Sequence, residues 1–269
     1  MDQVRLNNVH GCDWAILREV TGVEEQSITS TMTSDAIQLL EDLLVQTHPG
    51  SLKSEAISGL SAWDRDRMLA TVYMRIYGER IESTVSCVQC HENFDLDFSL
   101  PYLLESLNPE NNATAEVNAR QDGIYGFSDG LEFRLPTGED EIAVMGLSQE
   151  EGEQELLTRC IQNSPEGVNN QNRVQEIQAV MEAIAPLIDL ELDAQCPECG
   201  QEQQVHFDLQ HYLLSALSGE RTQLMREIHV LASTYGWSLA DILNLPRSQR
   251  RSLASLVSAD YGLEGGNGL

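Results

Sequence analysis

Two pairs of cysteines in this chain have the spacing of metal ligands. The first pair is Cys87-Val-Gln-Cys90, and the second is Cys196-Pro-Glu-Cys199. A tight turn lets both thiolates of one pair point at the same ion, and two such turns complete the tetrahedral shell that structural zinc prefers. We therefore expect one Zn²⁺ bound by Cys87, Cys90, Cys196 and Cys199. Because four thiolates fill this shell, the metal is expected to stabilise the fold and not to activate a substrate or water.

The same cysteines permit other interpretations. They could form disulfides or redox-active pairs, although neither pair lies in the strand-to-helix setting of a thioredoxin-type site. His91 directly follows the first pair and is either a spare ligand or a solvated side chain. Cys12 and Cys160 lie outside the pairs. They fit a reducing compartment, in which we expect them to remain ordinary thiols.

Each cysteine pair lies between two runs in which apolar and polar residues alternate. Residues 80–86 precede the first pair and 94–98 follow it, while 187–193 and 205–209 flank the second pair. Alternation with a period of two predicts a strand, so each unit reads as strand, turn and strand. The predicted fold class is α+β. It is a split zinc ribbon of two strand-CxxC-strand knuckles, with an inserted α/β segment, flanked by N-terminal and C-terminal helices.

The predicted organisation follows from where helix caps, turns and breakers fall. Ser34 and Ser148 are expected to begin helices, Gly78 to end one, and a helix that begins at Ser34 should stop before His48. The chain then divides into an irregular N-terminal arm (1–33), N-terminal helices (34–79), a first zinc knuckle (80–104), an inserted strand pair and helices (105–186), a second zinc knuckle (187–208), a C-terminal helical region (209–262) and a flexible tail (263–269).

The charge of the chain restricts its partners. Acidic residues outnumber basic ones 43 to 16, which gives a formal net charge of −27. A nucleic-acid-binding protein neutralises phosphates with Lys and Arg, so this class is disfavoured. The excess charge is either a solvated surface or a complement to a basic protein partner. We find no signal peptide and no apolar run near the ~20 residues of a membrane helix, and therefore expect a cytoplasmic protein without membrane contact.

The sequence has no recognisable catalytic motif. A P-loop, a nucleophile elbow and a dinucleotide fingerprint are absent, and the six histidines lack metalloprotease spacing. We expect a protein that is not an enzyme and has no small-molecule substrate. The C-terminal helices instead carry candidate partner-binding residues, Trp237, Arg247, Arg250 and Arg251. For Trp237, as for Ile242, the pattern favours a core anchor over a docking residue.

Four segments carry a resemblance to a known family. They are residues 63–81 leading into Cys87, residues 133–140, residues 196–200, and residues 227–251. In this order they resemble the baseplate hub assembly chaperones of contractile phage tails, the T-even phage family, in the form found in phage-tail-like contractile injection systems. The N-terminal arm contributes nothing to this resemblance.

The resemblance implies a non-enzymatic role in assembly of the baseplate hub of a syringe-like particle built in the cytoplasm. Its partners would be the hub or other baseplate proteins, and the C-terminal helices with Trp237 and Arg250 would dock on them. Two alternatives stay open. The chain could be a permanent structural baseplate subunit, or a zinc-ribbon regulatory or nucleic-acid-binding module, which its acidity opposes.

Overall fold

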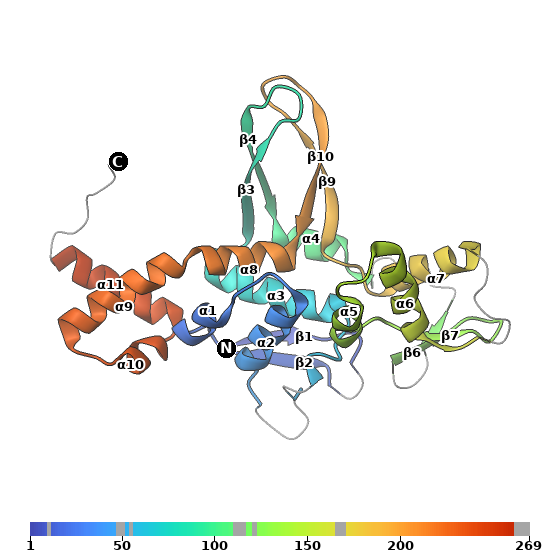
Figure 1. The fold of residues 1–269 in the computed structure, drawn as a ribbon, viewed down its shortest axis with the longest axis horizontal. Coiled ribbons are helices and arrows are strands. Elements are labelled where there is room, and N and C mark those ends of the chain that lie inside the picture. The colour runs from blue at the N-terminus through green and yellow to red at the C-terminus, as the bar shows by residue number, and fades with distance from the viewer. Residues whose placement is uncertain are drawn as a thin grey trace.

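Two β-hairpins project side by side from a central body of helices, and a further lobe lies at each end of that body (Figure 1). The computed structural model describes residues 1–9, 12–46, 52–53, 56–109, 117–119, 123–164 and 171–260. Among them, helices combine with four small antiparallel sheets. This combination confirms the predicted α+β class.

The N-terminal segment is folded, so the prediction of an irregular arm over residues 1–33 is wrong. Strands β1 (Asp2–Arg5) and β2 (Trp14–Leu17) pair antiparallel, and helix α1 (Gly22–Ser27) follows with a capping box between Thr21 and Glu24. The strands have only four residues each, too few for a clear alternation. Apolar side chains of this segment are buried against helices that come later in the chain: Val4, Leu6, Ala15 and Leu17.

Helices α2 (Thr33–Leu43) and α3 (Ala62–Tyr77) form the central body together with α8 (Leu209–Gly219). The Ser61 side chain accepts a hydrogen bond from the backbone N–H of Asp64 and begins α3. Gly78, with a φ of 90°, ends it as predicted. Helix α2 ends at Leu43 and therefore stops before His48, as predicted. Large buried side chains of this body include Leu39, Leu40, Trp63, Met68 and Leu69.

The sequence repeat is also a structural repeat. The first hairpin consists of β3 (Arg80–Ser86) and β4 (Asn93–Ser99), and the second consists of β9 (Asp189–Gln195) and β10 (Glu202–Asp208). All four strands have seven residues, and both hairpins run in an unbroken antiparallel register. Each leads directly into a helix, α4 (Leu100–Ser106) or α8 (Leu209–Gly219). Ser99 and Asp208, the last residue of each hairpin, provide the helix caps.

The segment between the hairpins forms a lobe with its own core. Its strands are β5 (Asn118–Ala119), β6 (Ile124–Gly126), β7 (Glu132–Arg134) and β8 (Ile161–Asn163), and its helices are α5 (Gly138–Val144), α6 (Gln149–Cys160) and α7 (Gln171–Ile184). The predicted strand pair is β6 and β7. The sheet is larger, in the order β5-β6-β7-β8, because two very short strands flank the pair. Phe127, Leu131, Phe133 and Ile177 fill this core.

The C-terminal lobe contains α9 (Arg221–Tyr235), α10 (Leu239–Leu243) and α11 (Arg247–Asp260). Gly236 ends α9 in the left-handed conformation. Leu231, Ile242, Ala254 and Val257 form a small separate core. The predicted tail at 263–269 lies outside the described residues.

Candidate metal centre

The turns at the tips of the two hairpins bring the four paired cysteines together. Their Sγ atoms all lie within 4.8 Å of one another. Sγ of Cys87 is 3.6 Å from that of Cys199, and Sγ of Cys90 is 3.7 Å from that of Cys196. Each close contact therefore joins one hairpin to the other. The sequence prediction that these four residues converge on one site agrees with this geometry.

The separations fit a tetrahedral metal ion. A zinc–thiolate bond of about 2.3 Å places neighbouring sulfurs of a tetrahedral shell about 3.8 Å apart. All four cysteines are free thiols, and their closest contacts are far longer than the ~2.05 Å of a disulfide. The donor set is entirely sulfur, which suits zinc or another thiophilic ion. The cluster can thus hold one metal ion with a complete protein shell.

The two cysteine turns have matching backbone geometry. In the first, the N–H of Cys87 donates to the carbonyl of Glu92, and the N–H of His91 donates to the carbonyl of Cys87. Cys196, Gly200 and Gln201 repeat this arrangement in the second turn. His91 and Gly200 occupy the equivalent left-handed position, with φ values of 62° and 75°. His91 is exposed and lies outside the thiol group, which favours the solvated interpretation of this residue.

The thiols interact strongly with each other and with the turn amides. Backbone N–H groups of Cys90 and Gln89 lower the pKa of Cys87 to about 6. At Cys90 the backbone N–H of Glu92 acts in the same direction, but burial and the thiols of Cys199, Cys87 and Cys196 outweigh it and raise the pKa to about 12. One thiolate is therefore favoured, while further thiolates repel it unless a cation shares the site.

A side chain that sequence reasoning missed holds the two tips in register. Gln203 of β10 accepts a hydrogen bond from the N–H of Val88 through Oε1, at 2.9 Å, and donates from Nε2 to the carbonyl of Ser86, at 3.3 Å. The buried ring of Phe94 packs in one group with Cys87 and Cys196 of the cluster. The only sequence signal for Gln203 is a polar residue on the inner face of an alternating strand, where an apolar side chain is expected.

The hairpins also pack against each other nearer the body. The rings of Phe98 and Phe207 meet edge to face, with centroids 5.0 Å apart. The hydroxyl of Tyr212 on α8 donates to the carbonyl of Glu82 on β3. Contacts at both ends of the hairpin pair thus position the cysteines independently of a bound metal ion.

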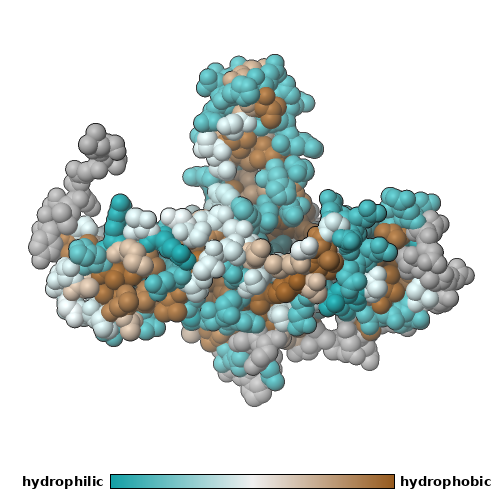
Figure 2. Space-filling model, in the orientation of Figure 1, coloured by the Kyte–Doolittle hydropathy of each residue, from teal (hydrophilic) through white to brown (hydrophobic). Residues whose placement is uncertain are grey.

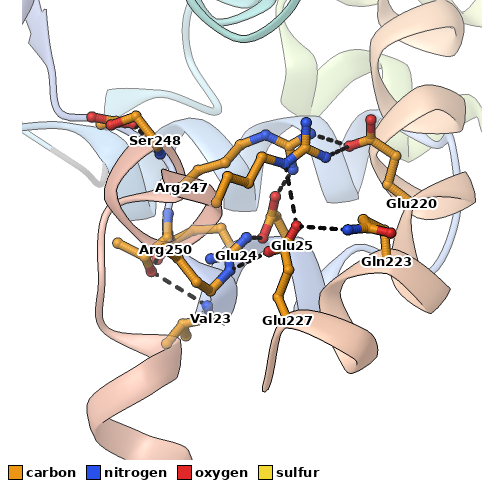
Figure 3. A network of polar contacts seen from close by, with 12 residues as sticks. Val23, Glu24, Glu25, Glu220, Gln223, Glu227, Arg247, Ser248 and Arg250 are labelled. Carbon is orange, nitrogen blue, oxygen red and sulfur yellow. Dashed lines mark hydrogen bonds and ion pairs between the residues drawn. The ribbon is translucent and has the colours of Figure 1, made fainter. Parts of the chain in front are cut away.

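The predicted partner-binding arginines belong to a second cluster, which Figure 3 shows between α1, α9 and α11. Arg250 is fully buried and pairs with Glu25 of α1 and, at 2.8 Å, with Glu227 of α9. Arg247 is 5% exposed and pairs with Glu25 and Glu220. The assignment of Arg247 and Arg250 to a partner surface is therefore wrong for this conformation, because their charged groups are already paired inside the protein.

The other two predicted partner residues lie at the surface. Arg251 contacts Glu220 at 3.0 Å, and its side chain remains 38% exposed. Trp237 is 39% exposed, and its ring stacks on Tyr235 with centroids 4.9 Å apart. Trp237 is thus not a core anchor, and it stays available as a contact residue.

Backbone groups at the start of α11 also contact the N-terminal segment. The N–H of Arg247 donates to the carbonyl of Val20 at 2.8 Å, and the N–H of Ser248 donates to the carboxylate of Glu19 at 2.7 Å. Gly22 permits this approach, since a Cβ there would lie 2.8 Å from the side chain of Leu243. The C-terminal lobe is therefore docked on the N-terminal segment.

Comparison with known proteins identifies the family. The model of the family described as T4 bacteriophage base plate protein matches residues 16–214. The chain belongs to this family. The match contains both hairpins and all four clustered cysteines, and it ends within α8. Baseplate-family membership, predicted from the four sequence segments, is confirmed, and the C-terminal lobe lies beyond the matched part.

Two further findings complete the comparison. No curated protein and no solved structure matches this chain. Within the described ranges, no helix has both the length and the apolar character needed to cross a bilayer.

Proposed function

We propose that this baseplate-family protein is a non-enzymatic, zinc-binding protein that assists assembly of the baseplate hub in a contractile, phage-tail-like particle. The observation that carries the proposal is the family match over residues 16–214. The resemblance of its sequence segments to hub assembly chaperones specifies the role. Its partners are then the hub or other baseplate proteins, and not nucleic acid, a membrane or a small molecule.

The proposed Zn²⁺ has a structural role. Cys87, Cys90, Cys196 and Cys199 would bind it, and four thiolates leave no position for a reacting group. Cys90 and Cys196 are separated by 106 residues in the sequence. The ion would therefore tie together two hairpins that the inserted lobe separates, which stabilises their joint projection from the body. Assembly in the cytoplasm would keep the thiols reduced and able to bind the metal.

The surface of the protein suits transient binding. The net charge of −27 favours a soluble, monomeric state and basic partners. The C-terminal lobe carries exposed apolar side chains close to Trp237, including Tyr235 and Leu239. An exposed apolar group of this kind can cover the interface of a hub protein until assembly is complete. Trp237 and Arg251 remain in the proposed contact set.

A permanent structural baseplate subunit is the second candidate. The family description, which names a base plate protein, favours it. A subunit and an assembly factor make the same first contact with the hub, and they differ in whether the chain is retained in the finished particle.

Purified particles separate the two candidates. We expect that deleting this chain from a particle-producing gene cluster abolishes baseplates, and that particles made with the wild-type chain contain it far below one copy per hub. The Trp237→Ala variant should reduce particle yield, while Tyr102→Ala, at an exposed site on α4, should not. Retention at a fixed stoichiometry would establish the structural subunit instead. Normal particles without the chain would reject both roles.

A further inference from the structure

An apolar pocket lies at the base of the second hairpin. It has a volume of about 360 Å³ and is open to solvent between α7, the start of α3 and the start of β9. Figure 2 shows apolar side chains around a hollow at this place, beside the projecting hairpins. Its apolar lining includes Leu135, Pro136, Met181, Ala185, Leu187 and Leu190. Leu187 is 48% exposed, so the pocket presents apolar surface that can still be buried.

The pocket opens onto an unpaired strand edge. Among the described residues, β9 pairs with β10 alone. At one end of the pairing the carbonyl of Ile188 accepts a hydrogen bond from the N–H of Leu209, and at the other the N–H of Cys196 donates to the carbonyl of Gln201. The backbone groups of even-numbered residues in β9 therefore face β10. Backbone groups alternate between the two edges of an antiparallel strand. The N–H and C=O groups of Asp189, Glu191 and Asp193 therefore point to the free edge of β9.

This edge is strongly acidic. The side chains of Asp189, Glu191 and Asp193 are exposed on the outer face of the strand. Glu182 of α7 adds a carboxylate at the rim of the pocket, and no Lys or Arg lines it. His206 of β10 lies 3.3 Å from the carboxylates of both Asp189 and Glu191. A protonated His206 would supply one positive charge against these four carboxylates, so the group would keep a net negative charge.

We propose that an extended, basic segment of another protein binds here, adds a third strand to β9 and places an apolar side chain in the pocket. The free backbone groups of β9 supply main-chain hydrogen bonds, which is how an extended peptide augments a sheet edge. The carboxylates select Lys or Arg on one side of the segment, and the pocket selects an apolar residue at its end. A second copy of this acidic chain would be repelled.

Only the identity of the partner rests on the proposed function: the segment is taken to belong to another baseplate protein. The strand-addition site itself follows from the pocket, the free edge and the charge. The two parts can therefore fail separately.

A synthetic peptide tests the site directly. The probe is a ten-residue, fluorescein-labelled peptide in which Lys alternates with Val, and its counterpart carries Glu in place of every Lys. Fluorescence anisotropy with the full-length, zinc-loaded protein should detect the Lys peptide alone, with an affinity that falls as salt rises. Absence of binding by the Lys peptide at low salt overturns the proposal.

The structural repeat provides a matched control. Glu82 on β3 occupies the position that Glu191 has on β9. Glu191→Lys should weaken binding about tenfold and Leu187→Ala about fivefold, whereas Glu82→Lys should change it less than about twofold. Equal losses from Glu82→Lys and Glu191→Lys would show attraction to the overall charge and reject a site on β9.

Amide hydrogen exchange distinguishes strand addition from side-chain contact. Peptide binding should slow exchange at the N–H groups of Glu191 and Asp193, which face the free edge. Binding without slowing there overturns the added strand. If Glu191→Lys loses the peptide but supports normal particle assembly, the assignment to a baseplate partner fails while the site stands. If the peptide does not bind but the chain is needed for baseplates, this inference fails and the proposed function stands.

Discussion

The four clustered cysteines lie where the tips of the two hairpins meet. Their sulfurs lie at the separations of a tetrahedral metal shell. We predict about one zinc per chain in protein purified without added metal, by elemental analysis. Cys87→Ser and Cys196→Ser, one from each hairpin, should both reduce the zinc content and lower the thermal midpoint, since binding free energy in such sites contributes to folding.

Cys12→Ser is the matched control for this measurement. Cys12 is a free, half-buried thiol outside the cluster, so the variant should keep its zinc. Well-folded wild-type protein without zinc would contradict the metal assignment. Loss of zinc in only one of the two cluster variants would contradict a single shared site.

The sequence predicts the role of a residue better when that role depends on its neighbours in the chain than when it depends on a partner far away in the sequence. The cysteines could be found because each pair carries its own spacing. Arg250 could not, because its partner Glu25 is 225 residues away in the sequence. The sequence of α11 does not show which of its arginines are exposed and which are buried. Only the position of α1 decides which of them are buried.

At the scale of elements, α3 shows how one helix ties together separate parts of the chain. Consecutive charged residues near its start point in different directions. Asp64 accepts hydrogen bonds from the N–H groups of Asn7 and Asn8, Arg65 pairs with Glu141 of α5, and Asp66 accepts one from the N–H of Ile188. All three are buried. The helix thus joins the N-terminal segment, the inserted lobe and the second hairpin.

Asp66 gives this helix a predictable pH dependence. Burial raises its pKa from 3.8 to about 7, although Arg65 and the N–H of Ile188 act in the opposite direction. Because the folded-state pKa lies above the unfolded one, protonated Asp66 stabilises the fold at low pH, and this contribution is lost as pH rises through about 7. On lowering the pH from 8 to 5, the free energy of unfolding of the wild type should rise relative to that of Asp66→Asn by roughly 2–3 kcal/mol.

Urea unfolding of both proteins at several pH values provides the measurement. All other titrating groups are common to the two proteins, so the difference between their profiles isolates Asp66. Parallel profiles would mean that Asp66 ionises normally in the folded protein.

The hairpins, the strand pair β6 and β7 and most helices could be predicted from local patterns, and the other short strands could not. Seven-residue strands show enough alternation to identify both hairpins, and the predicted cap at Ser148 begins α6. The cap predicted at Ser34 is wrong, because Ser34 lies inside α2, which begins at Thr33. Strands β1, β2, β5 and β8 have two to four residues each. Their existence depends on long-range pairing, and a short sequence window does not contain the partner.

At the scale of the whole molecule, the C-terminal lobe is docked on the N-terminal segment at α1. The lobe has its own small core, and it lies beyond the part matched by the baseplate family. Its position relative to the hairpins therefore depends on the charged cluster at α1, where Arg247, Arg250 and Arg251 face Glu25, Glu220 and Glu227. The cluster has equal numbers of positive and negative groups.

Arg250 is the residue on which this docking should depend most. Arg250→Met leaves Glu25 and Glu227 buried without their shared cation, and removal of one partner from a buried pair costs about 3–5 kcal/mol. Arg251→Met removes a cation that contacts Glu220 and Glu227, but the Arg251 side chain is 38% exposed. Its loss should cost no more than about 1 kcal/mol. Chemical denaturation of the two variants measures this contrast.

Hydrogen exchange locates the loss. If the cluster holds the lobe in place, Arg250→Met should speed amide exchange in α1 and α9–α11 while β3, β4, β9 and β10 stay protected, because the lobe can separate without opening the hairpins. A uniform increase over the whole chain would mean that lobe and body unfold as one unit. Equal destabilisation by Arg250→Met and Arg251→Met would show that burial of the charge does not set its contribution, and the lobe would then be held by apolar contacts.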